Sequence, residues 1–110
     1  MSLEINEKMA EIRDELRKEK DIDRRLTQMS VEVYQGVDYH PFVKAYVLKG
    51  EAFGISEGHY LYLVFNKRPG HRALVVSDAL YSTAEEAVRN ALSALRYFPL
   101  YGFSHRFLLD

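Results

Sequence analysis

The spacing between apolar residues changes twice along the chain, and this limits the possible folds more than any other feature. Up to about residue 29 apolar residues recur every three or four positions, as on one side of a helix. From Val31 to Val76 they alternate or run together as in strands, and from Ala87 to Phe98 the helical spacing returns. The sequence therefore predicts an α+β domain: an N-terminal helix, an antiparallel sheet of about four strands and a C-terminal amphipathic helix packed on the sheet.

The first 29 residues differ from the rest in composition. They carry 15 charged residues, seven basic and eight acidic, with no Gly, Pro or aromatic residue. A narrow apolar stripe lies on one side of the predicted helix and consists of Ile5, Met9, Ile12 and Leu16. The helix either continues to about residue 28 or restarts with Asp21 as its N-cap. We divide the single domain into a charged helical arm, residues 1–29, and an α+β core, residues 30–110.

Four segments of the core have strand patterns, beginning near residues 31, 43, 60 and 73. The run from Tyr60 to Phe65 has no polar alternation, which is typical of a central strand covered on both faces. Pro69-Gly70 predicts a turn that leads into the fourth strand. Because the links between strands are too short for parallel crossovers, we expect an antiparallel sheet with its helices on one face.

The last helix has clear start and stop signals. Ser82 with Glu85, or Thr83 with Glu86, offers a capping box at its start, and Pro99 and Gly102 are expected to stop it. The tail 103–109 either adds an edge strand or packs Phe107 and Leu109 against the core.

Composition excludes several classes of protein. The chain has 110 residues, enough for one domain, and a formal charge of −1, so any nucleic-acid contact must be local. Without cysteine it has no disulfides, thiolate nucleophile or Cys-ligated metal. No run is long and apolar enough for a bilayer span, and the N-terminus lacks the apolar stretch of a signal peptide. We expect a cytoplasmic protein with no membrane contact.

A basic hairpin is the most distinctive local feature. Lys67, Arg68, His71 and Arg72 flank the Pro-Gly turn, and Lys44 and Lys49 on the second strand widen the patch if that strand neighbours the hairpin. Residues 39–76 hold five basic and two acidic residues, a local charge of +3. Such a tip suits phosphate, although charges at a hairpin tip also serve simply to prevent edge pairing.

The chain has eight tyrosines and no tryptophan. Tyr60 and Tyr62 on the predicted central strand, together with the apolar stripe of the arm, are candidate partner-binding residues, since tyrosine combines apolar area with a hydroxyl group. The alternative is that they are ordinary sheet residues, because strands favour aromatic side chains.

Residues with catalytic or metal-binding potential form no known pattern. His40, His59, His71 and His105 have no HExxH or His-x-His spacing, and GxSxG and Walker A motifs are absent. We therefore assign no catalytic residue, metal or cofactor. An enzyme is less expected than a binding protein.

Three functions follow, in order of preference. The first is a small non-catalytic interaction or regulatory module, a homodimer or a partner of another protein, with the arm as the contact element unless the arm packs on its own sheet. The second is a nucleic-acid-binding accessory protein that uses hairpin 67–72, with Tyr60 and Tyr62 on the adjoining strand. The third is a small hydrolase with His59 or His71 as its base.

Overall fold

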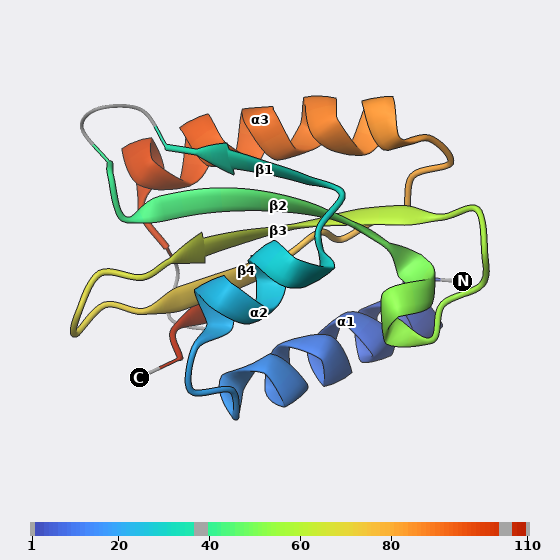
Figure 1. The fold of residues 1–110 in the computed structure, drawn as a ribbon, viewed down its shortest axis with the longest axis horizontal. Helices are drawn as coiled ribbons and strands as arrows, with labels where there is room; N and C mark the ends of the chain where they lie inside the picture. The colour runs from blue at the N-terminus through green and yellow to red at the C-terminus, as the bar shows by residue number, and fades with distance from the viewer. Residues whose placement is uncertain (1, 37–39, 104–106, 110) are drawn as a thin grey trace.

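The computed structural model describes residues 2–36, 40–103 and 107–109 and shows an α+β fold. Its elements, in chain order, are helices α1 (Ser2–Arg17) and α2 (Ile22–Met29), strands β1 (Glu32–Gln35) and β2 (Val43–Lys49), the 3₁₀ turn η1 (Gly50–Phe53), strands β3 (Tyr60–Asn66) and β4 (Ala73–Val76), and helix α3 (Ala84–Tyr101). The strands form one antiparallel sheet in the order β1-β2-β3-β4 (Figure 1).

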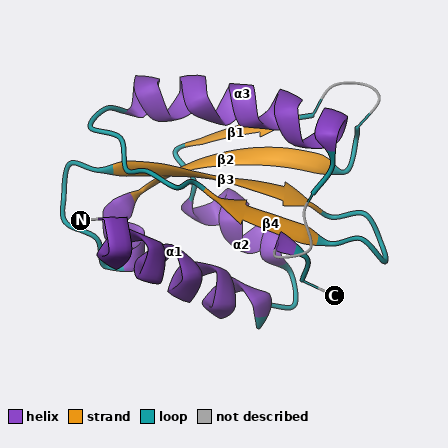
Figure 2. Ribbon diagram, turned by 180° about the vertical axis from the view of Figure 1, so that it is seen from behind, coloured by secondary structure: helices purple, strands orange, loops and turns teal. Residues whose placement is uncertain are grey.

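Helices cover both faces of this sheet, so the expectation of helices on one face was wrong. Helices α1 and α2 lie on one side and α3 on the other, giving three layers (Figure 2). The physical reason lies in β2 and β3, which are apolar on both faces. Tyr46 and Leu63 face the α1–α2 layer, whereas Val47 and Val64 face α3. Neither face of these strands is suited to water, which confirms β3 as a central strand covered on both sides.

The arm packs on its own sheet, which is the second of the two arrangements open to it. Met9, Ile12 and Leu16 are buried in the same apolar cluster as Tyr46 and Leu74. The side chain of Ile5 lies outside the described part. Met9, Ile12 and Leu16 of the stripe therefore form part of the core.

Local capping explains where α2 and α3 start. A short break after Arg17 ends α1, and α2 restarts with Asp21 as N-cap, whose carboxylate accepts a hydrogen bond from the Arg24 amide at 3.1 Å. At the start of α3 Thr83 is the N-cap, and its hydroxyl accepts from the Glu86 amide at 3.2 Å.

The sequence pattern predicted that Pro99 and Gly102 stop the last helix. In the structure α3 continues past Pro99 and ends at Tyr101, just before Gly102. Pro99 lies in the last turn and has no N–H to donate to the carbonyl four residues earlier, and the helix continues through it to Tyr101. The helix ends before Gly102, whose φ of 81° is in the left-handed region and whose amide donates to the Phe98 carbonyl at 2.7 Å.

Of the two alternatives for the tail, packing against the core is observed, whereas the described residues add a single bridge to the sheet and no edge strand. Leu108 forms an isolated antiparallel bridge with Ala73, and the Leu109 amide donates to the Arg72 carbonyl at 2.8 Å. Leu109 and Phe107 pack against the apolar clusters on opposite faces of the sheet. The tail therefore makes one bridge to the edge of β4 and packs against the apolar clusters on both faces of the sheet.

Candidate functional site

The hairpin between β3 and β4 has a defined shape. Its turn runs from Arg68 to His71, closed by a 3.0 Å hydrogen bond from the His71 amide to the Arg68 carbonyl, and Gly70 has a φ of 80°. This matches a turn that places Pro second and Gly third. The Asn66 side chain accepts from the Arg68 amide at 3.1 Å and donates to the His71 carbonyl at 3.3 Å. Asn66, which the sequence analysis overlooked, therefore supports the turn from the end of β3.

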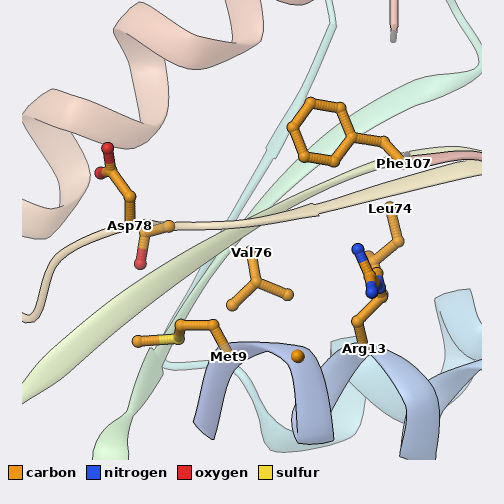
Figure 3. A pocket seen from close by; sticks show the side chains of 8 residues that line it. Met9, Arg13, Leu74, Val76, Asp78 and Phe107 are labelled. Atoms are coloured by element: carbon orange, nitrogen blue, oxygen red, sulfur yellow. The ribbon is translucent and has the colours of Figure 1, made fainter. Parts of the chain in front are cut away.

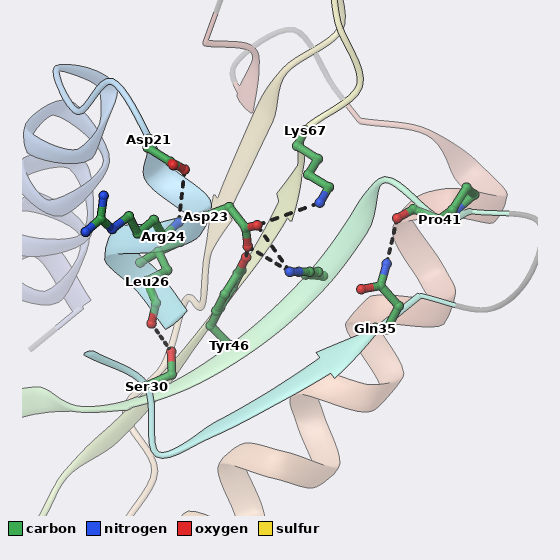
Figure 4. Close-up of polar contacts among 10 residues, drawn as sticks. Asp21, Asp23, Arg24, Leu26, Ser30, Gln35, Pro41, Tyr46 and Lys67 are labelled. Atoms are coloured by element: carbon green, nitrogen blue, oxygen red, sulfur yellow. Dashed lines mark hydrogen bonds and ion pairs between the residues drawn. The ribbon is translucent and has the colours of Figure 1, made fainter. Parts of the chain in front are cut away.

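Asp23 of α2 holds two of the predicted cations. Its carboxylate accepts hydrogen bonds from Lys44 Nζ at 3.0 and 3.2 Å and lies 3.7 Å from Lys67 Nζ (Figure 4). It also accepts a short hydrogen bond from the Tyr46 hydroxyl. Lys44 and Lys67 thus lie close together at one carboxylate, which offsets one unit of their charge.

The pKa values of this cluster follow from its partial burial. Burial raises the pKa of Asp23, but hydrogen bonds from Tyr46 and Lys44 and the charges of both lysines outweigh it, so the net pKa lies below the ordinary value of 3.8. Burial and the neighbouring Asp23 carboxylate raise the pKa of Tyr46. Asp23 is therefore ionised and Tyr46 neutral at pH 7.

The remaining predicted cations divide between the tip and the opposite end of the sheet. Arg68 and His71 are exposed at the turn, and Arg72 is half-buried beside them. Lys49 pairs with Tyr60 at the far end of β2, whereas Lys44 pairs with Phe65 near the hairpin. Five residues of strand span about 17 Å. Lys49 therefore does not extend the patch at the hairpin.

Tyr60 and Tyr62 do not lie beside the hairpin tip. Both are half-buried under α3, at the opposite end of β3 from Asn66. The Tyr62 ring stacks on Tyr81 with centroids 6.2 Å apart, and burial raises the pKa of Tyr62 to about 12. Because both faces of the sheet are covered, these rings pack against the apolar cluster between the sheet and α3.

An exposed aromatic ring instead lies beside the hairpin. Phe42, just before β2, is 43% exposed, and its carbonyl accepts from the Lys67 amide at 2.8 Å. Phe42 and Arg68 line a cleft of about 380 Å³ between the hairpin and the end of α3. Other residues that line the cleft are His40, Phe98, Pro99 and Phe103. The cleft joins three segments that are distant in sequence, so no local pattern announced it.

A second cleft of about 350 Å³ lies along β4, next to α1 (Figure 3). Its lining includes Met9, Arg13, Leu74, Val76, Asp78 and Phe107. Ser77, also in this lining, is buried, donates to the Ala79 carbonyl at 3.0 Å and accepts from the Tyr62 amide at 3.2 Å. A hydroxyl held in this way is a structural bridge between β4 and β3.

The described histidines occupy separate places. His59 precedes β3, with Nδ1 3.1 Å from the Ser56 carbonyl oxygen, whereas His71 lies at the hairpin beyond the other end of that strand. His40 lines the first cleft, and His105 lies outside the described residues. Within residues 2–36, 40–103 and 107–109, no group of three or more His, Asp or Glu side chains is arranged to hold a metal ion.

The same ranges contain no helix with both the length and the apolar character needed to cross a bilayer. No known family model matches the chain, and neither the curated proteins nor the solved structures include a significant match.

Proposed function

We propose that this protein is a non-catalytic module that binds nucleic acid through the hairpin end of its sheet. One observation carries the proposal: Arg68, exposed at a turn shaped by Asn66, lines the same cleft as the exposed ring of Phe42. No carboxylate among the described residues forms an ion pair with Arg68. A guanidinium group in this position suits a phosphate, and a neighbouring aromatic ring suits a base.

The charge at this end of the molecule supports weak, local binding. Lys67 is 38% exposed at its side chain but shares Asp23 with Lys44, so we count the exposed Arg68 as the cation most available to phosphates. For one phosphate contact on a single strand, the slope of log K against log salt is about −0.7. The affinity should therefore fall about 2.6-fold between about 50 and 200 mM salt.

The test is fluorescence anisotropy of labelled single- and double-stranded DNA and RNA at these two salt concentrations. Arg68→Ala should weaken binding to many sequences alike and make the salt slope shallower by about 0.7. Arg89→Ala is the matched control, because Arg89 is exposed on α3, nine residues before the cleft residue Phe98, or about 14 Å along the helix. Equal losses in both variants, or no binding at the lower salt, would reject the proposal.

A second candidate is the homodimer, with its contact at the β1 edge instead of the arm. Val31 and Val33 are exposed at this edge, and no strand in the described part of the chain pairs with its outer side. Because the Gly36 amide donates to the Val43 carbonyl, alternation points the backbone groups of Val33 and Gln35 away from β2. An antiparallel β1 from a second copy would pair with these groups and cover both valines.

Light scattering tests this candidate, since a dimer has twice the monomer mass of 12.8 kDa. Val33→Lys should convert a dimer to a monomer, because an edge lysine opposes strand pairing. A monomeric wild-type protein at micromolar concentration would exclude the dimer.

A further inference from the structure

The cleft beside the hairpin is fixed by contacts from each of its three walls. The Lys67 amide holds the carbonyl of Phe42 at 2.8 Å, and the Val43 amide donates to the His40 carbonyl at 3.2 Å. On the α3 side, the rings of Phe98 and Phe103 stack with centroids 5.4 Å apart. The volume of about 380 Å³ lies within the range of small-ligand sites. The walls are therefore in place before any ligand arrives.

The chemistry of the walls selects the ligand. Phe42, Phe98, Pro99 and Phe103 supply apolar and aromatic surface. The Asn66 amide is already used in the turn by its bonds to the Arg68 amide and the His71 carbonyl. Arg68 is the one cleft residue with a permanent positive charge. A matching ligand has one flat, largely apolar face and one anionic group close to it, which describes a nucleotide.

We propose that this cleft holds one unpaired base of single-stranded nucleic acid, stacked on the Phe42 ring with an adjacent phosphate at Arg68. This inference rests on the proposed function and adds selectivity to it. A base inside a duplex has both faces stacked on its neighbours and cannot reach Phe42 unless it leaves the helix. Single strands should therefore bind more tightly than duplexes, and the ring should account for the difference.

The test uses a labelled single-stranded DNA of about ten nucleotides, its duplex, and the same strand with abasic sites in place of the bases. Phe42→Leu keeps apolar bulk but removes the ring, and it should weaken single-strand binding about tenfold at either salt without changing the salt slope. Phe42→Leu should bind the duplex as tightly as the wild type does, and the same should hold for the abasic strand. The matched control is Leu92→Ala, an exposed apolar truncation on α3 outside the cleft, which should change nothing.

A second readout reports the stacking itself. A 2-aminopurine base in the labelled strand should lose fluorescence on binding the wild type more than on binding Phe42→Leu. Circular dichroism of Phe42→Leu checks that the fold is retained, as expected for a ring that is 43% exposed.

The outcomes separate this inference from the function on which it rests. If the abasic strand binds as tightly as the base-containing one, or if Phe42→Leu binds like the wild type, the base-binding cleft is wrong while hairpin binding stands. If no oligonucleotide binds, both fail. An acidic, aromatic peptide that displaces the bound single strand at lower concentration than a competing oligonucleotide would show that the cleft prefers a protein ligand and would overturn the inference.

Discussion

Removing the charge of Asp23 should weaken folding and strengthen nucleic-acid binding at the same time. In the structure Asp23 accepts hydrogen bonds from Lys44 and Tyr46 and lies 3.7 Å from Lys67 Nζ. Asp23→Asn keeps an oxygen that can accept from Tyr46, but it removes the charge that holds both lysines. The two effects have opposite signs, so a general loss of structure cannot imitate them.

The magnitude of the binding effect follows from the exposure of the two lysines. The Lys67 side chain is 38% exposed and next to the hairpin, whereas Lys44 is 20% exposed, so we expect one of them, Lys67, to reach a phosphate. One more contact on a single strand steepens the salt slope by about 0.7 and tightens binding about eightfold at about 50 mM salt. The stability cost should be about 1 kcal/mol, because the carboxylate accepts charge-assisted hydrogen bonds while partly exposed to water.

Anisotropy titrations and urea denaturation measure the two effects of Asp23→Asn separately. Glu51→Gln is the matched control, since it makes the same change of charge at an exposed site beside Lys49, at the far end of β2. If Glu51→Gln tightens binding as much, net charge and not the hairpin is responsible. If Asp23→Asn weakens binding while the protein stays folded, the phosphate-binding role of this end of the sheet is refuted.

The same contacts give a dependence of stability on pH. The folded-state pKa of Asp23 lies below its ordinary value of 3.8, so its stabilising contribution is present above that pH and is lost as the pH falls toward the lowered value. The difference in unfolding free energy between wild type and Asp23→Asn should therefore shrink below about pH 4. A difference that stays constant down to pH 2 would contradict the pairing of Asp23 with Lys44 and Lys67.

Four further predictions test the fold. Leu26 is fully buried on α2, so Leu26→Ala should lower the free energy of unfolding by about 2–5 kcal/mol in urea denaturation. The control, Leu92→Ala at an exposed position, should cost less than about 0.5 kcal/mol. Deletion of residues 1–29 should prevent folding. A stable, folded deletion variant would show that the arm is not part of the core. Gly70→Ala should cost about 1–2 kcal/mol, because Gly70 has a φ of 80°, and an unchanged melting temperature would argue against this turn. Burial raises the pKa of Tyr62 to about 12, so ultraviolet titration should show one tyrosine ionising about two units above the ordinary value of 10, and Tyr62→Phe should remove that phase.

The predictions from sequence agree best with the structure where the interactions that determine an element are local. The spacing of apolar residues predicted where β2, β3 and β4 begin, and Asp21 and Thr83 cap helices at positions the pattern proposed. Strand alternation and capping involve residues within a few positions of each other, so one stretch of sequence contains all the information. Pro99 shows the limit of such rules, because α3 runs through it to Tyr101 although proline has no backbone N–H to donate.

The candidate site depended on contacts between distant residues. The basic residues of hairpin 67–72 could be read from the sequence, but their pairing with Asp23 could not, because Asp23 lies on a helix that docks across the opposite face of the sheet from α3. Lys49 is not part of the basic patch at the hairpin, because strand register places it at the other end of the sheet. The exposed ring beside the hairpin is Phe42, whereas Tyr60 and Tyr62 pack under α3.

The sequence alone thus determined the elements of this protein, their order and the α+β class, because these depend on the periodicity of apolar residues and on short-range hydrogen bonds. Only the tertiary structure decided that the arm is core, that helices cover both faces of the sheet, and that Arg68 and Phe42 line one cleft. Burial and charge pairing depend on which surfaces meet when the chain folds, and those surfaces come from segments that carry no common local signal.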